Sequence, residues 1–234
     1  MTPKNQYEKS KLLGQAWGHA QLEMFEDSVK DCEALVNLDK DDPYSYIELG
    51  YYYQKIGNVE RAMDCCRYLM RRFPKYNVAY ANLGSIYQTD QKRFDIAMLL
   101  YEKALELNSL DTWALNNIGT ILQAEGKWKE ALSYYEKVTS SAKNLEKDRH
   151  YLILHNLGWA YYRCKKYKDA YRVFNYLAGE HEDKPSVFSD FGCVFYKMGR
   201  FKDALSSFEI ALKLCMDSRY YQRLWKVAYQ KRSI

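Results

Sequence analysis

The amino-acid sequence predicts an all-α protein made of stacked helix hairpins, and two recurring small residues predict it. A glycine preceded by an apolar residue recurs at spacings of 34, 35, 39 and 34 residues. These glycines are Gly50, Gly84, Gly119, Gly158 and Gly192. An alanine follows each of them after 12 or 13 residues, at Ala62, Ala97, Ala131, Ala170 and Ala204. Such a period is the signature of a helical array, whose units bury their apolar faces by stacking on one another.

The residues around these glycines match a known pattern. Those around Gly84 are Tyr80, Leu83, Tyr87, Ala97 and Tyr101, and similar sets accompany the other four glycines. The pattern resembles the tetratricopeptide repeat, a pair of antiparallel helices of about 34 residues with the motifs W-x2-L-G-x2-Y, A-x3-F and a final P. The resemblance covers nearly the whole chain. It implies a right-handed α-solenoid of about six helix hairpins with a C-terminal capping helix.

The resemblance implies a single superhelix over residues 1–234, with its elements in the following order. The expected repeats span 9–42, 43–76, 77–111, 112–150, 151–184 and 185–218, and the capping helix spans 219–234. The first repeat is degenerate, because Ser28 stands where alanine is expected. The 39-residue spacing places an insertion within 139–150, where either the flanking helices lengthen or a polar loop protrudes. Asp217 or Ser218 could serve as the N-cap of the capping helix.

The glycines are expected to have two different roles. Gly119 is a packing residue, because a residue without Cβ allows the closest approach of two helices, and Ala131 does the same on the second helix. Gly57, Gly126 and Gly199 are instead expected to end the first helix of their hairpins. In the second repeat, Cys66 replaces the usual aromatic residue of the second helix.

The composition bounds the class of protein. No stretch of about 18 apolar residues occurs, so we expect no membrane span and no membrane partner. The six cysteines show no C-x-x-C spacing and no disulfide framework, which favours reduced thiols and a cytoplasmic location. Residues 1–117 carry 14 basic and 17 acidic side chains, a net charge of −3, whereas residues 118–234 carry 21 and 13, a net charge of +8. A basic second half could steer an acidic partner, although a solvated lysine-rich face explains the same charge.

In the family's geometry, the first helices of the hairpins line a concave groove. By position, the inward row of this chain reads Glu48, Asn82, Asn117, Asn156 and Asp190. The three consecutive asparagines resemble the ladders with which some family members hold the backbone of an extended peptide, because an amide both donates and accepts hydrogen bonds. The alternative is that asparagine is simply common at this position of the family.

Neighbouring inward positions extend the expected partner-binding surface. They are Tyr51, Gln54, Gln88, Trp113, Asn116, Thr120, Gln123, His155, Trp159, Tyr162 and Tyr196. Trp113 and Trp159 carry the most weight, because aromatic anchors dominate the energetics of recognition. Either tryptophan could instead cover a neighbouring helix or the insertion.

No catalytic, cofactor or metal site is expected. The four histidines form no H-E-x-x-H motif, and the sequence has no phosphate loop, nucleophile elbow or calcium loop. The two-carboxylate clamp of the family's chaperone-binding members is not expected either. Its basic positions hold Ile47, Ala81, Asn116 and His155, or Tyr44, Val78, Trp113 and Leu152.

These observations predict a noncatalytic adaptor that binds a peptide or helix of a partner protein in the concave groove. One alternative is a structural or assembly subunit that uses its convex face or its ends, and a homo-oligomer would fit that alternative. The residues least favour a nucleic-acid partner, although basic and aromatic residues alternate within 162–172 as in some RNA-binding helical repeats. Lys165, Lys166 and Lys168 surround a turn between two helices, where solvated charges are expected in any case.

Overall fold

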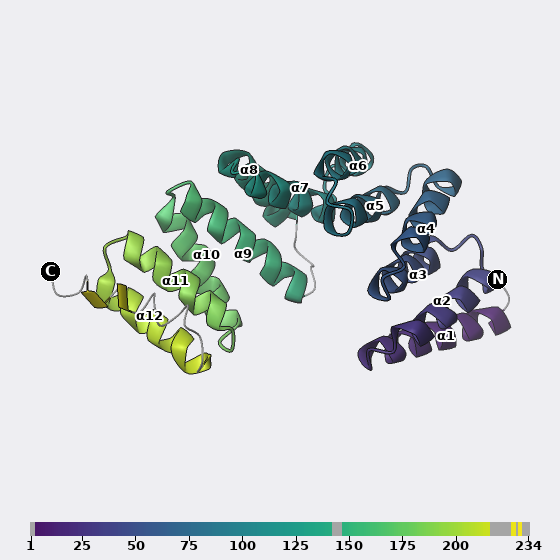
Figure 1. The fold of residues 1–234 in the computed structure, drawn as a ribbon, viewed down its shortest axis with the longest axis horizontal. Coiled ribbons are helices and arrows are strands. Elements are labelled where there is room, and N and C mark those ends of the chain that lie inside the picture. The colour runs from purple at the N-terminus through teal and green to yellow at the C-terminus, as the bar shows by residue number, and fades with distance from the viewer. Residues whose placement is uncertain (1–2, 142–146, 216–225, 228, 231–234) are drawn as a thin grey trace. The chain divides into compact units, whose positions relative to one another are not determined.

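The computed structural model describes residues 3–141, 147–215, 226–227 and 229–230, and every regular element in this part of the chain is an α-helix (Figure 1). The first helices of successive hairpins are α1 (Pro3–Gln21), α3 (Pro43–Lys55), α5 (Asn77–Thr89), α7 (Thr112–Ala124), α9 (Lys147–Arg163) and α11 (Pro185–Lys197). The second helices are α2 (Phe25–Leu38), α4 (Val59–Arg72), α6 (Phe94–Leu107), α8 (Trp128–Ser141), α10 (Tyr167–Glu180) and α12 (Phe201–Leu214). The predicted all-α fold of helix hairpins is confirmed.

The chain forms two compact units, Met1–Asn117 (unit 1) and Ile118–Ile234 (unit 2), and the boundary between them falls inside α7. In unit 1, the hairpins α1–α2, α3–α4 and α5–α6 form, and α2 packs on α3 and α4 on α5. In unit 2, the hairpins α9–α10 and α11–α12 form, and α8 packs on α9 and α10 on α11. Each second helix therefore contacts the first helix of the next hairpin within its unit, as stacked repeats require. One superhelix over the whole chain stays a prediction.

Side-chain caps and prolines fix several helix starts. Asp42 accepts a hydrogen bond from the Ser45 amide at 3.1 Å at the start of α3, and Pro43 follows it in the first turn. The Asp111 carboxylate accepts from the amides of Trp113 and Ala114 at 3.0 and 2.9 Å before α7. These contacts satisfy amide groups that have no partner inside the helix.

Each turn inside a hairpin contains one residue with a left-handed backbone conformation, and at three of the turns this residue is the expected glycine. Gly57, Gly126 and Gly199 have φ angles of +77, +78 and +77°, which confirms that they end α3, α7 and α11. The corresponding turns after α1, α5 and α9 also contain a residue with positive φ, but these residues are Glu23, Lys92 and Lys165. Non-glycine residues in this region carry backbone strain, so half of the turns of this kind cannot be found by searching for glycine.

The recurring glycines lie against aromatic rings of the second helix. A Cβ atom on Gly119 would lie 2.5 Å from Cε1 of Tyr135, whose ring is fully buried. The same arrangement joins three further pairs, Gly84 with Tyr101, Gly158 with Phe174 and Gly192 with Phe208. The expected packing role is thus confirmed, and the group that needs the space is the ring four residues after the repeat's alanine. Gly50 differs, because its nearest neighbour is Cβ of Cys65 at 3.4 Å.

The insertion within 139–150 is partly accounted for by a longer helix. α9 has 17 residues, whereas α3, α5, α7 and α11 each have 13. The additional turn extends the N-terminal end of α9 back to Lys147. Residues 142–146 lie outside the described part of the chain, and so does most of the expected capping helix over 219–234.

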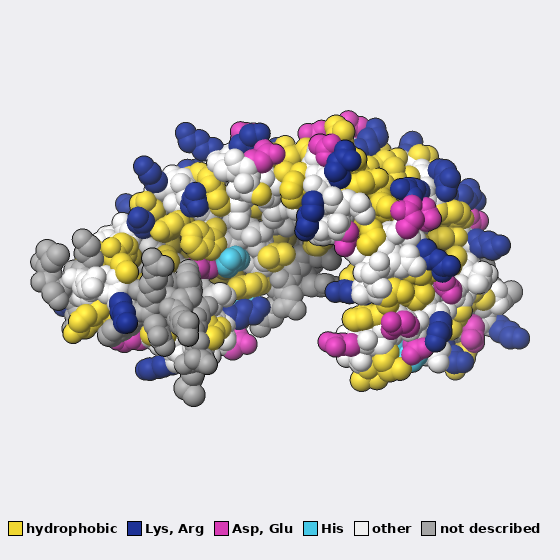
Figure 2. Space-filling model, viewed as in Figure 1, with side chains coloured by type: hydrophobic (Ala, Val, Ile, Leu, Met, Phe, Trp, Pro, Cys, Tyr) yellow, Lys and Arg dark blue, Asp and Glu magenta, His cyan; other side chains and the backbone are white. Residues whose placement is uncertain are grey.

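The surface mixes charged and apolar side chains, as Figure 2 shows for one face. Among the described residues, no helix is both long enough and apolar enough to cross a lipid bilayer. The six cysteines are all free, and Cys32, Cys65 and Cys66 are buried.

Candidate partner-binding site

Hydrogen bonds link side chains of neighbouring hairpins that lie about one repeat apart in the sequence. In unit 1, Asn77 Nδ2 donates to Asp111 Oδ2 at 2.6 Å, a separation of 34 residues along the chain. In unit 2, His155 Nε2 lies 2.6 Å from Asp190 Oδ2, a separation of 35 residues. In unit 2, side chains of the successive first helices α9 and α11 therefore meet, and in unit 1 the first residue of α5 meets the capping residue before α7. The inward row as a partner-binding surface stays a prediction.

The first member of that row is Glu48, which lies half-buried on α3. Burial raises the pKa of its carboxyl group, while hydrogen bonds from Tyr44 and Tyr52 oppose that shift. Tyr52 is buried, whereas Tyr44 is 52% exposed. Glu48 is thus a carboxylate held between two tyrosines one helical turn before and after it. The neighbouring Tyr51 is 49% exposed, with the Lys55 ammonium 5.2 Å from the centre of its ring.

The asparagines of the row differ in accessibility. Asn82 on α5 and Asn156 on α9 are half-buried. Asn116 and Asn117 on α7 are buried, with 2% and 8% of their surfaces exposed, and Asn116 Nδ2 donates to Asn117 Oδ1 at 3.5 Å. The Asn117 side chain is also hydrogen-bonded to the buried Tyr101. Little of either α7 amide is open to a partner, and their place in the partner-binding surface stays a prediction.

Two glutamines of the predicted surface satisfy core hydroxyl groups. Gln88 Oε1 accepts a hydrogen bond from the hydroxyl group of Tyr101 at 2.8 Å, and Gln123 Oε1 accepts from that of Tyr135 at 3.2 Å. Both tyrosines are fully buried, so their hydroxyl groups need an acceptor inside the protein. This structural role was not predicted from the sequence, although both glutamines lie four residues after a repeat glycine, Gly84 and Gly119.

In unit 2, polar and aromatic side chains of α9, of α11 and of the turn between α10 and α11 form what we call the Tyr151 cluster. Its members are Tyr151, His155, His181, Lys184, Ser186 and Asp190. The Tyr151 hydroxyl group and Ser186 Oγ are hydrogen-bonded at 3.1 Å, and the Lys184 ammonium lies 3.9 Å from the centre of the Tyr151 ring. The Asp190 carboxylate is buried, but the His155 side chain is 24% exposed. The cluster thus offers a partner an imidazole that is oriented by a buried carboxylate.

Trp159 lies on α9 one turn after His155 and is half-buried. Its ring meets Tyr162 edge-on at 5.0 Å and Phe174 at 6.5 Å. Part of the indole therefore covers the core, as the alternative interpretation holds, and part stays accessible. Trp113 on α7 is also half-buried.

Five of the predicted site residues lie on two neighbouring helices of unit 2. Within unit 2, His155, Asn156, Trp159, Tyr162 and Asp190 lie on the neighbouring first helices α9 and α11, and the His155–Asp190 contact joins these helices directly. Tyr151 and Ser186 were not among the site residues predicted from the sequence. Their separation of 35 residues, equal to that of His155 and Asp190, is the signal that could have found them. Among the described residues, no group of three or more His, Cys, Asp or Glu side chains could hold a metal ion.

Two family models, both described as "Tetratricopeptide repeat", match this chain. One matches residues 111–175, which hold α7, α8, α9 and most of α10. The other matches residues 78–109, which hold α5 and α6. The matches therefore fall on hairpins of both units.

Among curated proteins, the type IV pilus assembly protein PilF of Pseudomonas aeruginosa is 26% identical over 166 residues, which are 71% of this chain and 64% of PilF. The cell division cycle protein 16 homologue of Homo sapiens is 25% identical over 129 residues, which are 53% of this chain and 21% of that protein. The chain thus spans less than two thirds of the length of either relative.

Solved structures with a similar fold include those of the same PilF and of the APC/C hetero-tetramer Cut9–Hcn1. The PilF structure covers 82% of this chain and 86% of its own, at 26% identity, with a TM-score of 0.67. The Cut9–Hcn1 structure covers 97% of this chain and 46% of its own, with a TM-score of 0.76. At 15% identity, the second likeness concerns the fold alone.

Proposed function

Because this chain belongs to the tetratricopeptide repeat family, whose members are generally non-catalytic scaffolds that bind proteins, we propose that it is an adaptor for a partner protein. The partner would present an extended peptide or a helix to the concave groove lined by the first helices of the hairpins. The proposal includes a cytoplasmic location, which the buried free thiols of Cys32, Cys65 and Cys66 support.

The observation that carries the proposal is the surface of α9 and α11 in unit 2. Trp159 and Tyr162 are held edge-on to one another, and Phe174 supports the indole from beneath. Aromatic side chains that are already fixed lose little conformational entropy on binding, so more of their contact energy appears as affinity. The adjacent His155–Asp190 pair supplies a polar group beside the aromatic anchor. An anchor with a polar neighbour suits a peptide side chain and the backbone next to it.

The alternative of an assembly subunit is supported by the first hairpin of unit 1. Tyr7 and Trp17 on α1 are 72% and 66% exposed, and Leu22 after α1 is 71% exposed. Apolar side chains so exposed are typical of surfaces that meet another protein. The relative PilF is named as an assembly protein, although that name describes PilF and not this chain.

A single substitution pair distinguishes the two functions. Crosslinking in native extract followed by mass spectrometry would identify the partner, and calorimetry would then measure its affinity for the Trp159→Ala and Trp17→Ala variants. If the partner binds in the groove, we expect Trp159→Ala to weaken its affinity by about 30-fold, a loss of about 2 kcal/mol in binding free energy. Trp17→Ala should leave the affinity unchanged. The opposite result, binding lost with Trp17→Ala and retained with Trp159→Ala, would reject the groove in favour of an assembly subunit.

A further inference from the structure

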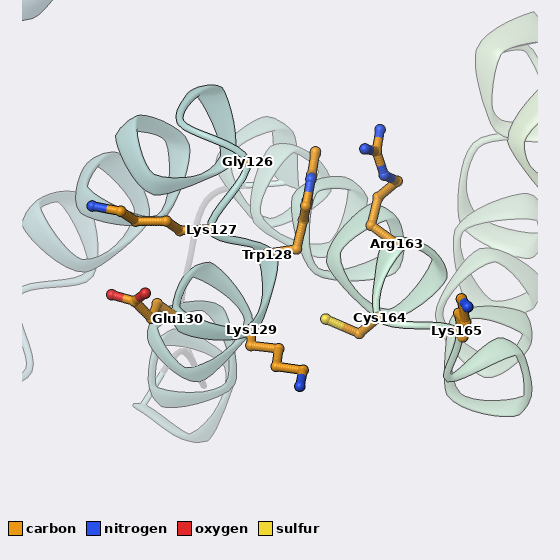
Figure 3. Close-up of a pocket in the computed structure, with 8 residues that line it drawn as sticks. All are labelled: Gly126, Lys127, Trp128, Lys129, Glu130, Arg163, Cys164 and Lys165. Carbon is orange, nitrogen blue, oxygen red and sulfur yellow. The ribbon is translucent and has the colours of Figure 1, made fainter.

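A pocket of about 590 Å³ lies in unit 2, at the turns of two neighbouring hairpins (Figure 3). One wall comes from the start of α8, with Trp128 and Lys129, and the other from the end of α9 and the turn after it, with Arg163 and Lys165. The volume lies within the range of about 300–1,000 Å³ that small ligands and side chains occupy in proteins. The pocket is formed by residues other than those of the proposed groove.

The pocket has an excess of positive charge. Four of its lining residues are basic, and Glu130 is the acidic one. Lys127 forms an ion pair with Glu125 at 2.8 Å. By contrast, Lys129, Arg163 and Lys165 form no ion pair with any carboxylate in the described part of the chain. Figure 3 shows the Lys127, Lys129 and Glu130 side chains extending away from the space between Trp128 and Arg163. Arg163 is therefore the labelled cation that borders this space, and Lys129 and Lys165 add positive charge from its surroundings.

Trp128 holds Arg163 in a defined position. The guanidinium group lies 4.4 Å from the centre of the indole ring, within the range of a cation–π contact. Figure 3 shows the two side chains standing side by side, one from each wall of the pocket. A guanidinium group that is fixed in this way still presents N–H groups in a planar fork, which matches the two oxygens of a carboxylate.

In the described helices, a basic residue that ends a first helix lies over the aromatic residue that begins the preceding second helix at two places, Arg163 over Trp128 at 4.4 Å and Lys55 over Phe25 at 6.0 Å. The pairing of arginine with tryptophan occurs at the first of these places. The residues that begin the second helices are Phe25, Val59, Phe94, Trp128, Tyr167 and Phe201, so tryptophan appears once. The first helices that follow α8 and α10 end in Arg163 and Lys197, respectively. The Lys55–Phe25 contact places an ammonium group at the equivalent position, whereas the Arg163–Trp128 contact places a planar guanidinium fork there.

We propose that this pocket binds an acidic segment of a partner protein. A glutamate or aspartate carboxylate would be held by the Arg163 fork, which Trp128 keeps in position, with Lys129 and Lys165 adding long-range attraction. A polyanion such as RNA fits less well, because one aromatic ring already contacts Arg163 and the nearby Glu125, Glu130 and Asp169 interrupt any continuous basic track. The site is independent of the proposed groove, and a partner could use either alone.

The test uses the full chain and a fluorescein-labelled peptide with a run of glutamates in a Gly-Ser frame. Fluorescence anisotropy at low salt would compare it with the same peptide carrying glutamines. The pocket variant is Lys129→Gln/Arg163→Gln. The matched control is Lys197→Gln/Lys202→Gln, which removes two positive charges from equivalent positions, the end of α11 and the second residue of α12. We expect the pocket variant to lose affinity by about tenfold or more and the control by less than about twofold.

Three results would overturn the proposal. The first is that the glutamate peptide binds no better than the glutamine peptide. The second is an equal loss in the pocket and control variants, which would indicate general charge attraction. The third is a single-stranded oligouridine that binds more tightly than the peptide and loses affinity in the pocket variant. The Arg163→Lys variant, which keeps the charge and loses the planar fork, should bind the glutamate peptide with intermediate affinity. Circular dichroism would verify that each variant is folded.

Discussion

Replacing Gly119 with alanine should lower the free energy of unfolding of unit 2, because the Tyr135 ring occupies the space that the new methyl group needs. The added Cβ would lie 2.5 Å from Cε1, 2.7 Å from Cζ and 3.0 Å from Cδ1 of that ring. Packed carbon atoms lie about 3.5–4.0 Å apart, so the nearest ring atom must move by about 1 Å. Tyr135 is fully buried and hydrogen-bonded to Gln123 at 3.2 Å, which leaves the ring little freedom to move.

The expected magnitude combines three contributions. Overpacking of a core costs about 1–3 kcal/mol. Loss of the Tyr135–Gln123 hydrogen bond would add about 1 kcal/mol, and the better helix propensity of alanine offsets about 1 kcal/mol. The net loss in the free energy of unfolding is therefore about 1–3 kcal/mol.

Gly50→Ala is the matched control, because its added Cβ would meet Cβ of Cys65 at 3.4 Å and the Ala62 carbonyl oxygen at 3.6 Å. These are ordinary contacts, so this substitution should be neutral or stabilise the protein by up to about 1 kcal/mol. Urea unfolding followed by circular dichroism would give the midpoint of each variant. Hydrogen exchange of the α7 and α8 amides would show whether the loss is local, since repeat arrays need not unfold in one step.

A second background tests the mechanism itself. Tyr135→Cys reproduces the natural combination of Gly50 with a cysteine, Cys66, in the second helix. In that background, Gly119→Ala should become neutral or stabilising, because the ring that opposes the methyl group is gone. The reasoning is refuted if Gly119→Ala destabilises the protein equally with and without Tyr135, or if it matches Gly50→Ala in the natural sequence.

Three further predictions concern backbone strain, a buried contact and pH. Lys165→Gly should raise the melting temperature and stabilise the protein by about 1 kcal/mol, because φ at this residue is +61°, whereas Gly126→Ala should lower it. Asp190→Ala should cost about 1–3 kcal/mol in urea unfolding, because it removes the buried partner of His155; an unchanged midpoint would contradict this. Burial raises the pKa values of four thiols from 9.0 to about 12, those of Cys32, Cys65, Cys66 and Cys193. As the pH rises, these thiols ionise in the unfolded chain before they ionise in the folded protein, so their contribution to stability is complete below about pH 9 and falls as the pH rises toward 12. The urea midpoint should therefore decrease more steeply above about pH 9. The decrease should be smaller in the Cys66→Ala variant.

The period of the repeat was readable from the sequence because it depends on sterics at single positions. A glycine and an alanine recur at fixed spacing, as Gly119 and Ala131 do in the fourth repeat. At Gly119, the Tyr135 ring leaves no room for a larger side chain. Left-handed turns were only half readable. Glycine adopts positive φ without strain and so marks Gly126, whereas Lys92 and Lys165 adopt it under tertiary constraint and leave no signal in their residue type.

The candidate site was less readable, because accessibility depends on what packs above a position. Asn82 and Asn117 occupy equivalent places in their repeats, yet Asn82 is half-buried and Asn117 is buried. The His155–Asp190 contact requires two side chains to meet across 35 residues. Position in the repeat assigned both residues to the predicted surface, but it could not show that they would form a pair.

The position four residues after each repeat glycine shows where structural and recognition roles separate. Where the second helix carries a buried tyrosine, this position holds a glutamine whose amide oxygen accepts a hydrogen bond from the tyrosine hydroxyl group, as in Gln88 with Tyr101 and Gln123 with Tyr135. Where the second helix carries Phe174 or Phe208 instead, no acceptor is needed, and the position holds Tyr162 or Tyr196. When the core residue has no hydroxyl group, the position four residues after the glycine no longer needs to supply a hydrogen-bond acceptor. This release permits a change without requiring one, because Gln54 is retained in the second repeat, where Cys66 supplies no hydroxyl group. After Gly158 the released position holds Tyr162, which meets Trp159 edge-on at 5.0 Å on the surface that the proposed function uses.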